Sequence, residues 1–245
     1  MKKSILAILF SAAVLVSAAN LTACNGNTGN PDNSVGGNME ESGNGNDSNG
    51  GIEGNNSGNG DNGSEAIVFE PIEIPIGYED YLVGEFDFSV AIPENWELQE
   101  YAPNVVAAWL NEDFSTENAR SNTNITVSRD TTATQVAMQS EDFQSELLRM
   151  FDESYADMFD NFESEGVSEM TLGYNYFLLY TYTYTMSNEE LGLIDVPFKV
   201  NQVMSVIEHN MVTFTFAYPA EAVQGENGQR AALIQNEILS TLRPI

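Results

Sequence analysis

Alternation of apolar and polar residues recurs along the chain from residue 86 to residue 218 and predicts β-strands. The predicted strands cover residues 86–92, 105–110, 124–129, 174–186, 196–208 and 211–218, with a further strand opening at Trp96. Pro93 and Pro219 end the strands before them, because proline cannot donate a hydrogen bond to a neighbouring strand. His209 and Asn210 form the predicted turn between the last two strands. Strands joined by such short turns pair antiparallel.

In two segments the apolar residues recur with the period of an α-helix. Between residues 140 and 163, apolar side chains recur every three or four positions and acids occupy the opposite face, which predicts an amphipathic helix with Ser140 as its N-cap. Residues 229–242 predict a closing helix with Leu233 and Ile238 among its inward side chains. Because a helix buries its apolar stripe against another element, the expected fold is α+β, with a single antiparallel sheet of about six strands flanked by helices.

The N-terminal segment, residues 1–23, has the layout of an export signal. Two lysines precede an apolar run from Ile5 to Val16 that is too short to span a bilayer. The chain continues through Leu21-Thr22-Ala23-Cys24, which resembles the lipobox of bacterial lipoproteins, and Cys24 is its single cysteine. The resemblance implies cleavage after Ala23 and a diacylglyceryl group on the Cys24 thiol, and two acyl chains anchor a protein stably to a membrane. An ordinary secretory signal with a chance cysteine is the alternative.

Residues 24–66 predict a disordered tether that begins at the lipidated cysteine. Of the 42 residues from 25 to 66, 12 are glycine and 12 are asparagine, and apolar side chains are almost absent. Such a segment cannot bury enough surface to offset its chain entropy. Its root-mean-square span is about 35 Å. Residues 58–63 match the dinucleotide-binding pattern G-x-G-x-x-G, but neither a strand nor a helix flanks them, so we assign the match no function.

Residues 67–245 form the predicted globular domain, and their charge restricts the partners they can bind. The chain has 8 basic and 37 acidic residues, and 6 and 30 of these lie in the domain, which gives it a net charge of −24. This charge repels phosphate, so nucleic-acid binding is excluded, and it attracts a cationic protein, peptide or ion. One cysteine and one histidine exclude an internal disulfide, a thiolate zinc site and any cluster of imidazoles.

Two stretches resemble PsbP-like domains. Phe88-Ser89-Val90-Ala91-Ile92-Pro93-Glu94-Asn95-Trp96 is similar to their opening strand and turn, and Val212-Thr213-Phe214-Thr215-Phe216, followed by a helix that ends near Leu242-Arg243, is similar to their ending. The resemblance covers residues 86–243 and implies a PsbP-like α/β/α sandwich. It also implies a binding or assembly role, since the family includes extrinsic photosystem subunits and exported bacterial lipoproteins, some of which bind divalent ions. It implies no catalytic residue.

The sequence contains no diagnostic arrangement for catalysis. His209 is the one candidate base for a Ser-His-acid triad, but it falls at a predicted turn, and no G-x-S-x-G motif is present. Two of the 30 acids can lie at glycosidase spacing by chance, and none belongs to a recognisable motif. The sequence therefore identifies no catalytic, cofactor-binding or metal-ligating residue. A small cell-envelope hydrolase that uses paired carboxylates is the alternative function.

Two other groups of residues have both a functional and a structural interpretation. The acidic loop 111–113 and the acids Asp157, Asp160, Glu163 and Glu165 are candidate calcium ligands. However, the sequence contains no EF-hand loop, and acids spaced along a helix usually form a solvated face. Four tyrosines share one face of the strand predicted over 174–186. If this face is exposed, the rings can stack on a ligand; if a helix covers it, they form part of the hydrophobic core. The core interpretation is favoured. The four tyrosines are Tyr176, Tyr180, Tyr182 and Tyr184.

We therefore expect a lipid-anchored protein on the extracytoplasmic face of the cell membrane. Its domain is expected to act as a non-catalytic binding or adaptor module for a cationic protein, peptide or ion. No cofactor is expected, with calcium as the alternative.

Overall fold

The computed structural model describes residues 72–99, 105–129, 134–188 and 193–245. The predicted signal segment, the tether and Cys24 lie outside the described residues, so their assignments stay predictions. The strands are β1 (Tyr78–Val83), β2 (Phe88–Pro93), β3 (Glu97–Leu98), β4 (Ala107–Asn111), β5 (Ser121–Arg129), β6 (Asp160–Leu172), β7 (Asn175–Asn188), β8 (Leu193–Ile207), β9 (Asn210–Pro219) and β10 (Arg243–Pro244). The helices are α2 (Gln135–Met138), α3 (Glu141–Ala156) and α4 (Glu226–Ser240).

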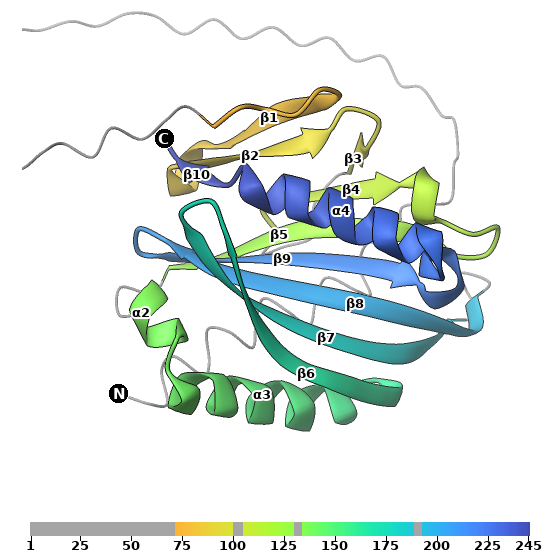
Figure 1. The fold of residues 1–245 in the computed structure, drawn as a ribbon. Coiled ribbons are helices and arrows are strands. Elements are labelled where there is room, and N and C mark those ends of the chain that lie inside the picture. Colours follow the sequence, from red (N-terminus) through yellow and green to blue (C-terminus); the bar gives the residue numbers. More distant parts are fainter. Residues whose placement is uncertain (1–71, 100–104, 130–133, 189–192) are drawn as a thin grey trace, which may run out of the picture. The chain divides into compact units, whose positions relative to one another are not determined.

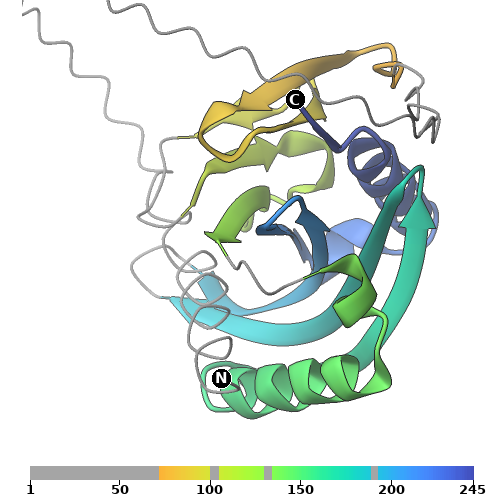
Figure 2. The ribbon, with the colours of Figure 1, turned by 90° about the vertical axis from the view of Figure 1, so that its left-hand side faces the viewer.

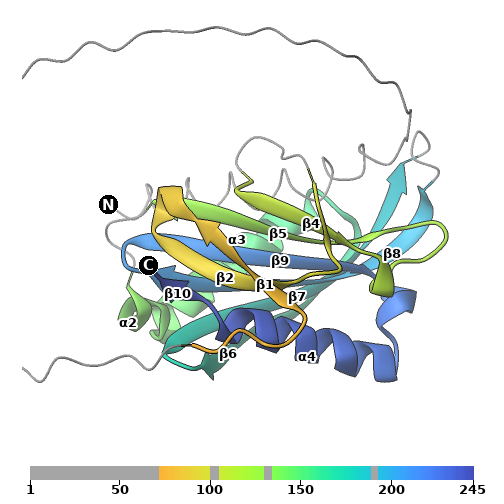
Figure 3. The ribbon, with the colours of Figure 1, turned by 90° about the horizontal axis from the view of Figure 1, so that it is seen from above.

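The strands form two antiparallel sheets with helices packed on them (Figure 1). The large sheet has seven strands in the order β3-β4-β5-β9-β8-β7-β6, and β1, β2 and β10 form a small sheet. One face of the large sheet packs against α3, and the other packs against α4 and the small sheet (Figures 2 and 3). The predicted α+β fold, an antiparallel sheet flanked by helices, is confirmed.

The prediction of one sheet needs a correction, because the strand predicted over 86–92 lies in the small sheet as β2. All six residues of β2 are buried. Val90 and Ile92 belong to the same core cluster as Ile125 and Phe214 of the large sheet, while β1 pairs with β2 along its length. β2 is therefore enclosed by a neighbouring strand and by the large sheet, and its apolar alternation alone does not distinguish this position from a strand within the large sheet.

The helix predicted over 140–163 is shorter than expected. It begins as predicted, with the Ser140 hydroxyl accepting a hydrogen bond from the Phe143 amide at 3.2 Å, but it ends at Ala156 and β6 starts at Asp160. Phe159 and Phe162 fit the helical spacing although they follow the helix, because the chain turns back beside α3 and both rings pack against Tyr182. The Phe162 centroid lies 5.7 Å from that of Tyr182.

The core beneath α3 is built from the alternating tyrosines of β7. Tyr176, Tyr180, Tyr182 and Tyr184 are buried and pack against α3 residues such as Phe151 and Tyr155. The Phe151 and Tyr180 ring centroids lie 5.0 Å apart, as do those of Tyr155 and Tyr182. The interpretation of these tyrosines as core is confirmed, so they do not form an exposed stacking surface.

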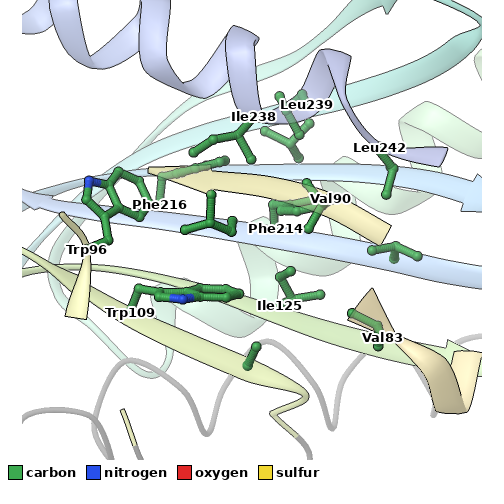
Figure 4. Packing of buried hydrophobic residues seen from close by; sticks show 14 of the residues in the cluster. Val83, Val90, Trp96, Trp109, Ile125, Phe214, Phe216, Ile238, Leu239 and Leu242 are labelled. Carbon is green, nitrogen blue, oxygen red and sulfur yellow. The ribbon is translucent and has the colours of Figure 1, made fainter. Parts of the chain in front are cut away.

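The opposite core joins the large sheet to α4 and the small sheet (Figure 4). Trp109 and Phe216 come from the large sheet, Val90 from β2, and Ile238 from α4. The prediction that Leu233 faces inward is wrong, because its side chain is 58% exposed. The buried row of α4 runs through positions 231, 235 and 238, at helical spacing, and position 233 lies off that row.

The turn between the last two predicted strands lies one residue earlier than expected, because Asn210 already begins β9. β8 and β9 are joined by a turn at Glu208 and His209, and Glu208 takes a positive φ of 54° there. Within the described ranges, we find no helix that is long and apolar enough to cross a membrane.

Candidate functional site

A cleft of about 420 Å³ lies between the N-terminal half of α4 and the large sheet. Its helix side is formed largely by small residues, including Gly225, Gly228, Ala231 and Ala232. Because these side chains are short, they leave space above the sheet. The polar part of the lining comes from Glu165 of β6, Thr181 of β7, Lys199 and Asn201 of β8, Tyr218 of β9, and Gln229 and Gln235 of α4.

Strand register brings the polar lining onto one face of the sheet. Thr181 lies opposite Asn201 in the β7–β8 pair, and Lys199 lies opposite Tyr218 in the β8–β9 pair. Residues that are directly opposite in paired strands face the same side, and so do residues two positions apart along a strand. The sheet side of the cleft is therefore formed mainly by three neighbouring strands, β7, β8 and β9.

Four of the neutral side chains of the cleft form one continuous hydrogen-bonded chain. The Thr181 hydroxyl donates to Asn201 Oδ1 at 3.1 Å, Asn201 Nδ2 donates to Gln235 Oε1 at 3.0 Å, and Gln235 Nε2 donates to the Tyr218 hydroxyl at 2.9 Å. Each amide is thereby held in one orientation. A network of this kind fixes the helix relative to three strands.

Burial raises the pKa of Tyr218, and the hydrogen bond from Gln235 opposes that effect only in part. The hydroxyl therefore stays neutral at physiological pH and cannot serve as a general base.

An ion pair between the two charged residues of the lining completes the cleft. Lys199 Nζ lies 2.9 Å from Glu165 Oε1, with the side chains 38% and 56% exposed. The pair joins β8 to the edge strand β6 across β7. Because both groups are partly solvated, we expect the pair to contribute little to stability, up to about 1 kcal/mol.

The described lining of the cleft contains no pair of carboxylates. A glycosidase needs two carboxyl groups that flank the scissile bond, whereas Glu165 is the one carboxylate among the lining residues and it is paired with Lys199. The other polar groups are neutral amides and hydroxyls. This arrangement gives the hydrolase hypothesis no support.

A second feature is the acidic face of α3 and β6. Residues 141–172 contain ten acids and a single base, Arg149. Arg149 pairs with Glu146 at 2.8 Å and with Glu153 at 2.6 Å. Asp157, Asp160 and Glu163 are exposed and form no ion pair with any residue that the structure describes. We use the name "acidic face" for the ten acids Glu141, Asp142, Glu146, Asp152, Glu153, Asp157, Asp160, Glu163, Glu165 and Glu169.

The loop considered for calcium is occupied by internal contacts. Asn111 Oδ1 accepts a hydrogen bond from the Asp113 amide at 3.0 Å, Asp113 pairs with Arg230 at 2.8 Å, and Glu112 pairs with Arg120 at 3.2 Å. Among the residues with a described placement, no group of three or more potential ligands is gathered closely enough to hold a metal ion.

The other sequence candidates are dispersed. His209 is exposed at the turn between β8 and β9, far along the strands from the residues of the cleft. All four acids considered between residues 157 and 165 belong to the acidic face, and Glu165 also lines the cleft. Cys24 lies outside the described residues.

Apart from Glu165, which was considered only as a calcium donor, sequence reasoning did not find the residues of the cleft. Lys199 and Asn201 occupy polar positions in a strand that reads as ordinary alternation, and Gln235 lies on the inward row of α4 where an apolar residue is expected. A buried glutamine on that row is a signal that could have been used, because a buried amide requires hydrogen-bond partners.

No protein-family model and no curated protein matches the chain. Solved structures of similar fold include the cyanobacterial PsbP protein CyanoP from Synechocystis sp. PCC 6803, with a TM-score of 0.47 and 9% identity over 73% of this chain and 99% of that chain. The Ran-binding protein Mog1p of Saccharomyces cerevisiae has a TM-score of 0.45 and 7% identity over 68% and 95% of the two chains. LpqN of Mycobacterium tuberculosis, involved in cell envelope biogenesis, has a TM-score of 0.44 and 12% identity over 63% and 81%. Similarity at this level of identity concerns the fold and does not identify the function.

Proposed function

We propose that the protein is a lipid-anchored extracytoplasmic lipoprotein whose domain is a non-catalytic binding or adaptor module for a cationic protein, peptide or ion. The observation that carries the proposal is the acidic face, where ten acids and one arginine lie within 32 consecutive residues, 141–172. A surface with such a surplus of one sign concentrates partners of the opposite sign and accelerates their association. The cleft supports the non-catalytic part, since its lining lacks a second carboxylate.

The partner proposal is tested with a charge-neutralised variant and a matched control. The test variant carries Asp157→Asn, Asp160→Asn and Glu163→Gln on the acidic face. The control carries Glu79→Gln, Glu94→Gln and Glu117→Gln, three acids exposed elsewhere on the domain. Both variants have the same net charge, so they differ only in where the charge is removed.

Binding of a lysine-rich peptide to the mature chain is measured by titration at low and at physiological salt. If each exposed contact contributes about 0.3–0.5 kcal/mol, the test variant loses about 5- to 10-fold in affinity. The control variant should lose less than half of that. Equal losses in the two variants would show that the peptide responds only to net charge, and this result would contradict the proposal.

A further inference from the structure

The large sheet ends at β6, and the outer side of this strand is open. No strand that the structure describes pairs with β6 on the side away from β7, and Figure 1 shows β6 along the border of the sheet, next to α3. The other strands with an unpaired side are shorter, since β1 has six residues and β3 and β10 have two each. β6 has 13 residues and therefore presents the longest unpaired edge in the described part of the domain.

The second half of β6 is regular enough to take a further strand. From Gly166 to Leu172, each residue lies opposite one residue of β7, and the register shifts fall before this stretch. We use the name "open edge" for the side of residues 166–172 that faces away from β7. In an antiparallel pair, the N–H and C=O groups of alternate residues point toward the partner strand, and those of the residues between them point away. The open edge therefore carries a donor and an acceptor at every second residue.

The turn between β6 and β7 identifies these residues. The turn consists of residues 173–174, with Leu172 opposite Asn175. In a hairpin with a two-residue loop, the residues that flank the loop form a hydrogen-bonded pair, and outward-pointing residues alternate from there. No backbone group elsewhere in the described structure bonds to the outward-pointing residues. These residues are Val167, Glu169 and Thr171.

Acids on both faces of β6 make the open edge complementary to a basic segment. Glu169 lies on the α3-facing side, where Gln144 of α3 donates to its Oε1 at 2.6 Å. Glu165 lies on the other side, where it lines the cleft beside α4. α3, β6, β7 and β8 together contain two bases, Arg149 and Lys199, and both already pair with acids. Because an added strand places its side chains alternately on the two faces, its basic side chains meet carboxylates on either face.

We propose that the open edge binds an extended basic segment of a partner protein as an additional strand of the large sheet. Backbone hydrogen bonds to Val167, Glu169 and Thr171 supply the affinity, and lysine or arginine side chains that reach the acids of β6 supply the selectivity. Strand addition at this edge rests on the proposed function, because the added strand is one form of the cationic partner.

The test uses the mature full chain and three eight-residue peptides in titration calorimetry at low salt. The first peptide alternates lysine and threonine. The second has the same sequence with N-methyl groups on its six central amides, which keep the charge and remove the hydrogen-bond donors. The third has glutamate in place of lysine. We expect the first peptide to bind, the second to bind at least about 10-fold more weakly, as the loss of about two backbone hydrogen bonds requires, and the third not to bind.

The outcomes separate the mode of binding from the proposed function. If none of the peptides binds, both are contradicted. If the first two peptides bind equally, the cationic partner stands and strand addition is excluded. If the lysine and glutamate peptides bind equally, the edge does not select a basic segment, and the proposal is overturned.

Amide hydrogen exchange followed by NMR locates the bound peptide. In the free protein, the amides of Val167, Glu169 and Thr171 should exchange faster than that of Met170, whose N–H points toward β7. Saturation with the lysine–threonine peptide should slow the first three by at least about 10-fold and change the fourth little. Binding without this protection, or with protection on β1 instead, would refute the assignment to the open edge.

A pair of variants at Thr171 tests the backbone contact from the side of the protein. Thr171→Pro removes one outward N–H, and proline is tolerated where a strand edge has no neighbour. Thr171→Ala lacks the same side chain but keeps the N–H. The peptide should bind Thr171→Pro about 3- to 10-fold more weakly than Thr171→Ala, and equal affinities would contradict the proposal. If Thr171→Pro fails to fold, the exchange measurement on the parent chain decides.

Discussion

Gly228 offers a quantitative test of how α4 is held against the rest of the domain. In an exposed helix, replacing glycine with alanine stabilises the fold by up to about 1 kcal/mol, because alanine loses less backbone entropy. Gly228 lies in the first turn of α4, but a Cβ at this position would stand 2.5 Å from the carbonyl oxygen of Val223 and 3.4 Å from its carbonyl carbon. Both atoms are backbone, so no side-chain rotation relieves the contact.

The expected effect of Gly228→Ala is therefore a loss of stability. Overpacking of this kind costs about 1–3 kcal/mol, and the gain in helix propensity offsets part of it, which leaves a net loss of about 1–2 kcal/mol. For a domain of this size, the melting temperature should fall by about 2–8 °C. Scanning calorimetry or circular dichroism measures the shift directly.

The control for this prediction is Asn227→Ala. Asn227 is the exposed neighbour in the same helical turn, so its replacement should leave the melting temperature unchanged or raise it slightly. If Gly228→Ala were as stable as the parent or more stable, the close approach of α4 to residues 220–223 would not be the reason for glycine at position 228, and the account of the cleft wall would be wrong.

Four further predictions concern the anchor, the cleft, pH and calcium. Cys24→Ser should move the protein from the membrane fraction to the soluble fraction, and unchanged retention on fractionation would contradict lipidation. Tyr218→Phe should cost about 1–2 kcal/mol in denaturant unfolding, because Gln235 Nε2 loses its buried acceptor; an unchanged midpoint would show that the chain of hydrogen bonds is not needed. Burial raises the pKa values of Tyr155 and Tyr218 above the ordinary 10.0, so these hydroxyls lose their protons at lower pH in the unfolded chain than in the folded one. The free energy of unfolding should therefore be unaffected by these groups below pH 10 and fall as the pH rises further. Melting temperatures that stay constant above pH 10 would refute this. Calcium and magnesium at matched ionic strength should shift the melting temperature equally, as screening of the acidic surface requires, and a shift produced by calcium alone would indicate a specific site.

Most of the large sheet and both long helices could be predicted because their residues alternate or repeat against a core. The tyrosines of β7 are an example, since five apolar side chains on alternate positions identify both the strand and its buried face. β6 escaped prediction for the opposite reason. It is an edge strand, most of its residues are exposed or only partly buried, and bulges interrupt its pairing with β7, so no regular alternation marks it.

The candidate sites could not be predicted because they depend on pairing between strands that are distant in sequence. Asn124 and Gln202 belong to two strands that are distant in sequence, and only the β5–β9–β8 register places them in one row. Likewise, Lys199 meets Glu165 across an intervening strand. The sequence does indicate the surplus of acids between residues 141 and 172, but it does not show that α3 and β6 lie side by side.

The composition of β6 affects whether two copies of the domain can pair through their sheet edges. β6 has 13 residues, and one of its sides has no neighbouring strand in the described sheet. A long open strand can pair with the same strand of another molecule and start aggregation. Here, Glu163, Glu165 and Glu169 and the bulges between Asp160 and Gly166 oppose such pairing, since two copies would bring like charges and mismatched backbones together. Copies of the domain can therefore be brought close together without pairing through β6.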